Sequence, residues 1–228
     1  MREIVLDTET TGLDPLQGHR IVEIGAVELF NHIPTGNTYH TFINPQRDVP
    51  REAEAVHGLS SGFLKDKPIF SKIVDEFIEF IGETVLIIHN ASFDVGFLNA
   101  ELGFIKRPPI LPERIIDTLL LAKKRHPMGP NSLDALCKRY GIDIAKRTKH
   151  GALLDSELLA GVYLELIGGR QIALTLPKAE NIRKLQIGGV PLQTKRTNAL
   201  PERITDEERE RHETLVKSLG AAALWKST

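Results

Sequence analysis

Three apolar segments lie within the first 43 residues, and the short connections between them restrict the fold more than any other feature of the chain. Residues 4–6 have the composition of a short buried strand, and residues 21–30 that of a longer one. Turn-forming residues at 33–37 then precede a third strand at 39–43. Consecutive strands with such short connections predict an antiparallel meander.

Helical and strand patterns alternate after this meander. Apolar residues recur at helical spacing over 70–81, and residues 85–88 form a compact apolar strand. Ser92 is expected to cap the following helix, which carries Phe93 and Phe97. Further helical patterns follow at 118–124, 132–140 and 152–167. Strands gathered first and then alternating with helices predict an α/β fold with a mixed sheet flanked by helices.

Composition is that of a globular enzyme. The 228 residues, 41% of them hydrophobic, suffice for one medium domain and an appendage. The net charge of −1 means that any contact with nucleic acid depends on local features. The chain contains neither a signal-like N-terminus nor an apolar run of membrane-spanning length, which predicts a cytoplasmic protein without membrane contact. Cys137, the single cysteine, excludes an internal disulfide and is expected to be a small buried residue.

The composition changes after the glycine pair at 168–169, where prolines, glycines and polar residues interrupt any long apolar period. We therefore expect a compact domain at 1–169 and a flexible linker at 170–199. Apolar residues return after the charged stretch at 206–213, so residues 200–228 are expected to form a terminal helix or a docking peptide.

Asp7 and Glu9 follow the first strand with one residue between them. Alternation along a strand places both carboxylates on one face. Like charges this close repel each other, so the pair favours a bound divalent cation, and a solvated strand end is the alternative.

Three further polar residues lie at element ends. Asp94 follows the second core strand, where sheet enzymes often gather functional side chains, although an acid there also stabilises a helix dipole. His150 lies in a loop, and Asp155 lies on the first turns of the next helix, so both can face one site. An isolated His is commonly structural, but an acid on an apolar helix face needs a partner or an ion.

These four carboxylates and one imidazole meet the requirements of two-metal phosphoryl transfer. Two Mg²⁺ or Mn²⁺ ions about 3.5–4 Å apart need oxygen ligands and no thiolate. The residues therefore indicate a metal-dependent hydrolase that acts on phosphodiesters.

Three segments resemble, in order and spacing, the motifs of the DEDDh 3′→5′ exonuclease family. They are residues 7–12, 89–94 and 150–155. The resemblance covers the first three-quarters of the chain and implies a ribonuclease-H-like fold with a central five-stranded mixed sheet.

The same resemblance implies a role for each polar residue. Asp7, Glu9 and Asp155 are expected to bind the two cations, and Asp94 mainly the second, partly through water. His150 is expected to be the general base.

The family also implies the contacts with the DNA 3′ end, which is trimmed to 5′-mononucleotides. Besides Asp7, Glu9 and Asp155, the expected contacts are Thr8, Thr10, Gly12, Val56, His57, Asn90 and Phe93. The packing of bases on apolar faces does not depend on the base sequence of the DNA. Core packing is the alternative explanation for Val56 and Phe93.

Two peptides in the tail resemble partner-binding segments. Gln171, Leu174 and Leu176 match the pattern of the bacterial sliding-clamp motif, with an ordinary linker as the alternative. The last segment is similar to the one by which proofreading epsilon subunits bind the alpha subunit of bacterial DNA polymerase III. Its expected contact residues are Leu215, Leu219, Leu224 and Trp225. A helix folded back on the nuclease is the alternative, and a theta-like small subunit is a further partner implied by the family.

Three functions are compatible with these features. The first is a proofreading exonuclease of a replicative polymerase. The second is a free-standing DEDDh nuclease that trims RNA or short oligonucleotides, against which the tail argues. The third is a tether between polymerase and clamp with a silent nuclease, which the intact motifs do not support.

Overall fold

The computed structural model describes residues 1–145, 149–168 and 204–219. The chain divides by its internal contacts into two units, Met1–Ala173 and Leu174–Thr228. Within the described residues, every helix is too short or too polar to cross a membrane.

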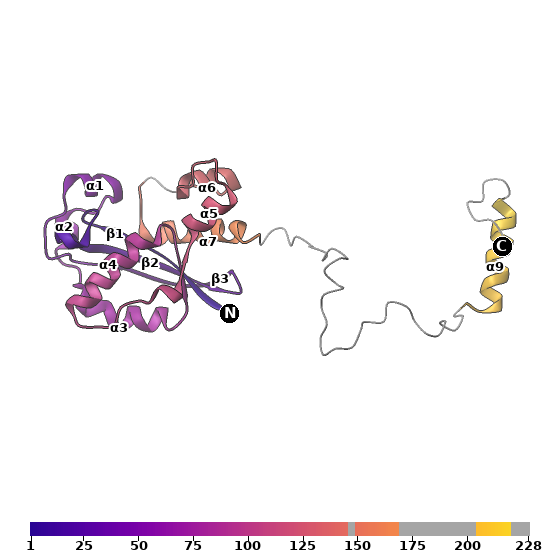
Figure 1. The fold of residues 1–228 in the computed structure, drawn as a ribbon, viewed down its shortest axis with the longest axis horizontal. Helices are drawn as coiled ribbons and strands as arrows, with labels where there is room; N and C mark the ends of the chain where they lie inside the picture. The colour runs from indigo at the N-terminus through magenta and orange to yellow at the C-terminus, as the bar shows by residue number, and fades with distance from the viewer. Residues whose placement is uncertain (146–148, 169–203, 220–228) are drawn as a thin grey trace, which may run out of the picture. The chain divides into compact units, whose positions relative to one another are not determined.

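The first unit is built around a mixed sheet of five strands in the order β3-β2-β1-β4-β5. Figure 1 labels β1, β2 and β3 of this sheet among the surrounding helices. β1 (Arg2–Thr10) pairs antiparallel with β2 (Ile21–Phe30), which pairs antiparallel with β3 (Ile33–Phe42). β1 also pairs in parallel with β4 (Val85–Ile88), and β4 with β5 (Ile115–Asp117). The predicted meander and the five-stranded mixed sheet are confirmed.

Helices cover both faces of this sheet. α3 (Phe70–Ile81) and α4 (Ala91–Phe104) pack on one face. α7 (Ala152–Leu166) packs on the other face, with α5 (Thr118–Arg125) and α6 (Leu133–Tyr140) against it. The helices predicted from apolar periodicity are all present, with ends shifted by at most a residue or two.

Alternating side chains of β1 divide the core in two. Ile4 and Leu6 belong to the cluster shared with α3 and α4, whereas Val5 packs with Leu159 of α7. Cys137 is fully buried between α6 and α7, as predicted. The side of β1 that carries Val5 therefore faces α7.

The turn predicted at 33–37 is wrong, because β3 already begins at Ile33. The turn consists of Asn31 and His32, whose φ angles are 50° and 67°. Two residues with positive φ make a tight hairpin turn that matches the twist of the strands, and Asn adopts this conformation readily. Pro34 fits into β3 because this strand lies at the sheet edge.

Two other local expectations are also wrong. The first strand extends well beyond residues 4–6, because pairing with β2 continues to Thr10. Ser92 does not cap α4 but lies within its first turn. α4 begins at Ala91, after Asn90 in the left-handed conformation.

Short helices that the apolar pattern did not predict complete the first unit. α1 (Arg51–His57) and α2 (Ser61–Leu64) lie between β3 and α3. Two 3₁₀ turns, η1 (Pro15–Gln17) and η2 (Pro112–Arg114), follow β1 and precede β5. α1 is too short and too charged to produce an apolar period.

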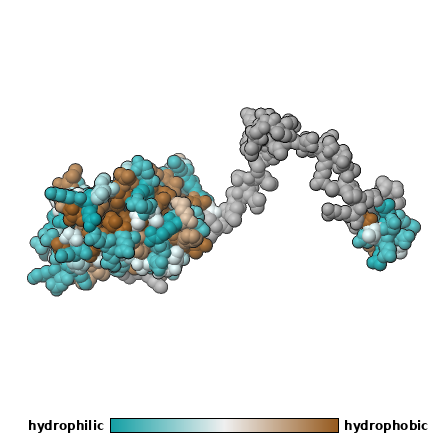
Figure 2. All heavy atoms as spheres, turned by 90° about the horizontal axis from the view of Figure 1, so that it is seen from below, coloured by the Kyte–Doolittle hydropathy of each residue, from teal (hydrophilic) through white to brown (hydrophobic). Residues whose placement is uncertain are grey.

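The described part of the second unit is α9 (Asp206–Leu219). Thr205 and Glu208 form a capping box at its start: the Glu208 carboxylate accepts from Thr205 N at 2.8 Å, and Thr205 Oγ1 accepts from Glu208 N at 3.3 Å. Its visible surface is mainly polar (Figure 2), but Leu215 and Leu219 are 55% and 41% exposed. The other predicted partner-binding residues lie outside the described residues: Gln171, Leu174, Leu176, Leu224 and Trp225.

Candidate active site

Asp7 and Glu9 lie on the face of β1 that is directed at α7, as the alternation predicted. In the ladder, Asp7 is opposite Gly25 of β2. A Cβ on Gly25 would be 2.1 Å from Leu153 N in the first turn of α7. Ser156 Oγ also donates to the Gly25 carbonyl at 2.9 Å. Glycine at this position therefore lets the start of α7 approach the strand beside Asp7.

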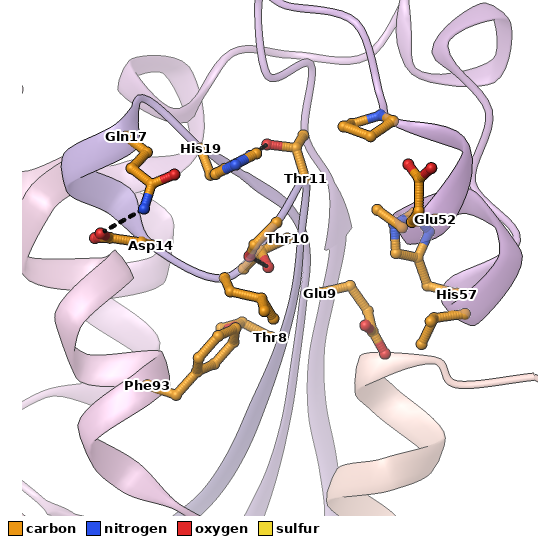
Figure 3. Close-up of a pocket in the computed structure, with 15 residues that line it drawn as sticks. Thr8, Glu9, Thr10, Thr11, Asp14, Gln17, His19, Glu52, His57 and Phe93 are labelled. Atoms are coloured by element: carbon orange, nitrogen blue, oxygen red, sulfur yellow. Dashed lines mark hydrogen bonds between the residues drawn. The ribbon is translucent and has the colours of Figure 1, made fainter.

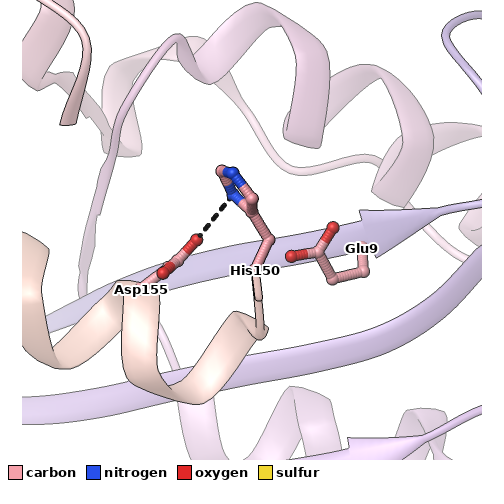
Figure 4. A group of neighbouring side chains, drawn as sticks. All are labelled: Glu9, His150 and Asp155. Atoms are coloured by element: carbon pink, nitrogen blue, oxygen red, sulfur yellow. Dashed lines mark hydrogen bonds and ion pairs between the residues drawn. The ribbon is translucent and has the colours of Figure 1, made fainter. Parts of the chain in front are cut away.

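Glu9, His150 and Asp155 form a compact group (Figure 4). One ligand atom from each residue lies within 4.8 Å of the others. His150 Nδ1 lies 3.2 Å from Asp155 Oδ2, and the two side chains are 48% and 4% exposed. The His150 amide donates to the Val56 carbonyl at 3.3 Å, which ties this loop to α1. The structure thus brings together three of the five predicted catalytic residues.

Asp94 reaches β1 from the opposite face of the sheet. Its Oδ1 accepts hydrogen bonds from Thr8 N at 3.0 Å and from Thr8 Oγ1 at 2.7 Å. Burial raises the pKa of this carboxyl to about 7, although both bonds from Thr8 oppose the increase. Asp94 is therefore anchored to the residue between Asp7 and Glu9.

A pocket of about 580 Å³ opens at the end of β1 (Figure 3). Phe93 of α4 and the loop after β1 form one wall, and α1 forms the other. Among the expected substrate contacts, the following line it: Thr8, Glu9, Thr10, Gly12, Val56, His57 and Phe93. Asn90 lies outside the pocket, exposed at the start of α4.

The positions of Val56 and Phe93 bear on whether these residues contact the substrate or pack in the core. Val56 is 49% exposed, so core packing does not account for it. Phe93 is partly buried and packs on Phe97 with ring centroids 5.0 Å apart, so it both supports the core and forms a pocket wall. His57 is buried and its Nδ1 accepts from Leu59 N at 3.0 Å. Burial lowers the pKa of His57, which keeps its ring neutral near pH 7.

Several lining residues were not predicted from the sequence. They are Thr11, Leu13, Asp14, Gln17, His19, Pro50, Glu52 and Ala53. Those in α1 could have been found only by recognising Pro50 and Gly58 as the boundaries of a short helix, since Gly58 follows it at φ 81°. Leu13 is 85% exposed and lines the pocket.

Comparisons with known proteins place this chain in a family. The family model described as exonuclease matches residues 4–163, so the chain belongs to the exonuclease family. A relative from Rickettsia conorii is 49% identical over 223 residues, with 96% of each chain covered. One from Escherichia coli K12 is 43% identical over 241 residues, with 99% of this chain and 98% of the relative covered. Both are named DNA polymerase III subunit epsilon, and within the exonuclease family this chain belongs to the epsilon-subunit group.

Solved structures share the fold of the first unit. Exonuclease X in complex with 5′ overhanging duplex DNA is 25% identical, with a TM-score of 0.59 over 73% of this chain and 92% of that one. The nuclease domain of 3'hExo, a DEDDh family member bound to rAMP, is 17% identical, with a TM-score of 0.64 over 74% and 92%. The ribonuclease-H-like fold is thus confirmed. The family model and the epsilon-subunit relatives together make the chain a 3′→5′ exonuclease.

Divalent metal dependence is consistent with the family and the site. E. coli Exonuclease I, in a structure of its complex with single-stranded DNA, is described in a zinc-bound form; it is 17% identical, with a TM-score of 0.63 over 75% of this chain and 41% of that one. Glu9 and Asp155 supply two carboxylates within 4.8 Å of each other and of His150, and carboxylate oxygens are donors that suit a divalent cation.

Proposed function

We propose that this chain is the proofreading 3′→5′ exonuclease of a DNA polymerase III holoenzyme. It hydrolyses the terminal phosphodiester of a DNA 3′ end by a two-metal mechanism. The observation that carries this proposal is the group of Glu9, His150 and Asp155 at the end of β1, next to a pocket lined by their neighbours.

In this mechanism, Asp7, Glu9 and Asp155 would hold two cations, Mg²⁺ or Mn²⁺, and Asp94 would contribute mainly to the second, partly through water. The closely spaced carboxylates repel one another, which favours the bound state of a cation. When bound, the cations lower the pKa of the attacking water and stabilise the charge that develops on the leaving 3′ oxygen.

His150 is the proposed general base. A hydrogen bond from Nδ1 to Asp155 Oδ2, at 3.2 Å, leaves Nε2 as the proton acceptor. The half-exposed ring can reach a water molecule, while its contact with Asp155 holds its orientation. The bond from the His150 amide to Val56 limits movement of the loop.

The pocket is proposed to hold the unpaired 3′-terminal nucleotide. Val56 and Phe93 offer apolar surfaces to a base, which accounts for trimming that is independent of sequence. Thr10 Oγ1 donates to the Gly12 carbonyl at 2.6 Å and keeps the turn after β1 compact. Thr8 and the neutral His57 complete the proposed contacts within the pocket, and Asn90 is a proposed contact outside it.

A primer–template with a mispaired 3′ end and a label at its 5′ end tests this function. We expect stepwise shortening from the 3′ end with release of 5′-mononucleotides in Mg²⁺, and no release with a chelator. A mispaired end should be removed about tenfold faster than a paired one, because unpairing a mismatched end costs less and a difference of about 1.4 kcal/mol is a factor of ten in rate. Equal rates on paired and mispaired ends would contradict proofreading, and faster cleavage of a single-stranded RNA of the same sequence would support the free-standing nuclease.

We also propose partner sites in the tail and the corresponding division of the chain. Residues 1–169 are the catalytic domain, and 170–199 form a linker in which Gln171, Leu174 and Leu176 bind the sliding clamp. Residues 200–228 bind the polymerase alpha subunit, and the exposed Leu215 and Leu219 of α9 support this role. A theta-like subunit is a further proposed partner, and the complex acts in the cytoplasm.

Removal of residues 200–228 tests the polymerase site. We expect the shortened chain to lose co-purification with the alpha subunit while it keeps its activity on a free primer. A variant with Gln171→Ala and Leu174→Ala is the matched control, because it should lose binding to the sliding clamp and keep binding to the alpha subunit. Unchanged co-purification of the shortened chain would exclude this assignment.

A further inference from the structure

The Asp117 carboxylate bonds the first backbone N–H groups of two different helices. On its own helix, α5, Asp117 Oδ1 accepts from Leu119 N at 2.8 Å and Leu120 N at 3.4 Å. At the start of the other helix, α4, Asp117 Oδ1 accepts from Asn90 N and Asp117 Oδ2 accepts from Ala91 N, both at 3.2 Å. One side chain thus caps both α4 and α5.

The start of α4 depends on this outside partner. Its own N-cap residue, Asn90, lies at φ 63° and makes no side-chain capping bond. Asp117 reaches it because β4 and β5 run in parallel and pair Ile88 with Asp117, so both strands end at the same sheet edge. A carboxylate at this place also complements the dipoles of both helices.

The first turn of α4 carries two residues of the site. Asp94 contacts β1 through both Thr8 bonds, and Phe93 forms a pocket wall. Both come within four residues of Asn90, so the placement of the helix start determines where they meet β1. A displacement of about 1 Å at such a position costs about 100-fold in rate.

We propose that Asp117 is a positioning residue of the exonuclease, which holds the first turn of α4 so that Asp94 and Phe93 meet β1 correctly. It acts through backbone N–H groups and touches neither the substrate nor the cations. The link to catalysis rests on the role proposed above for Asp94.

Asp117→Asn tests this role. Asn caps a helix about as well as Asp, so its amide oxygen can retain the bonds to Leu119 and Leu120, but its NH₂ group cannot accept from Ala91. We expect faster amide hydrogen exchange at Ala91 and Thr8, and an affinity for Mn²⁺, measured by calorimetry, that is about tenfold weaker. Thermal stability should change much less than in a variant without any cap.

Ser132→Ala is the matched control, because Ser132 Oγ caps α6 through Ala135 N at 3.3 Å and its loss leaves α4 untouched. If Asp117→Asn and Ser132→Ala showed the same Thr8 exchange and the same Mn²⁺ affinity, the proposal would be overturned.

Asp117→Ser, which keeps one oxygen for α5, replaces the Asn variant if that variant does not fold. Asp94→Asn separates the two hypotheses: unchanged Mn²⁺ affinity there refutes the role of Asp94, whereas Thr8 exchange in Asp117→Asn still reports on positioning.

Discussion

Asp155→Asn is expected to lower the rate of 3′-nucleotide release by about 1000-fold, which corresponds to about 4 kcal/mol of transition-state stabilisation. Asp155 is 3% exposed and lies with Glu9 and His150 in one group. Asn has the same shape but no charge, so it loses the attraction for a cation and weakens the bond that orients His150. Single-turnover rates on a mispaired primer measure the effect.

The stability of this variant distinguishes a chemical effect from a folding defect. A buried carboxylate beside Glu9 is destabilising without a cation, so Asp155→Asn should leave the melting temperature equal or higher in chelator. Glu157→Gln is the matched control, since Glu157 is exposed on the same helix and should keep the full rate. A rate within tenfold of wild type for Asp155→Asn would rule out its role as a metal ligand.

Gly25→Ala is expected to damage both stability and catalysis. The new Cβ would lie 2.1 Å from Leu153 N and 2.2 Å from Ala152 C, and backbone atoms can yield only if α7 moves. Overpacking of this kind costs about 3 kcal/mol. Because the displaced turn carries Asp155, the rate should fall by about 100-fold as well.

Gly103→Ala is the control for this experiment. Gly103 lies in α4, and a methyl group added there would meet no neighbouring atom within 4 Å, so alanine should stabilise the helix by about 0.5–1 kcal/mol. Denaturant unfolding and nuclease rates would be measured for both variants. Wild-type stability of Gly25→Ala would show that α7 has room to accept a side chain between itself and β2.

The elements that could be predicted are those whose signal is local. Apolar periodicity located α3 and α7 within a residue or two, and it located β2 and β4 without error. The failures lie where this signal is absent. Ser92 is a residue type that commonly caps helices, but the side chain that caps α4 is Asp117. The pairing of β4 with β5 brings Asp117 to the start of α4. The hairpin at Asn31 depends on backbone conformation that periodicity does not report.

For the site, spacing within the motifs predicted which polar residues lie close together, but it did not predict the contacts with distant segments. Alternation correctly put Asp7 and Glu9 on one face, and the helix start correctly put Asp155 near His150. The family resemblance marked Val56 and His57 as contacts, but apolar periodicity did not show that they lie on a helix that closes the pocket, because the seven residues of α1 contain no apolar period. Nor does the sequence indicate that Gly25 leaves room for the start of α7, since that contact joins residues far apart in the chain.

The alternation along β1 makes the whole site sensitive to strand register. Asp7 and Glu9 face α7, while Thr8 between them holds Asp94 on the other side of the sheet. One extra residue before Asp7 would turn both acids toward α4 and Thr8 toward α7, so that the two halves of the site would exchange sides. Insertions in loops away from the site leave this arrangement intact, whereas an insertion or deletion of one residue in β1 does not.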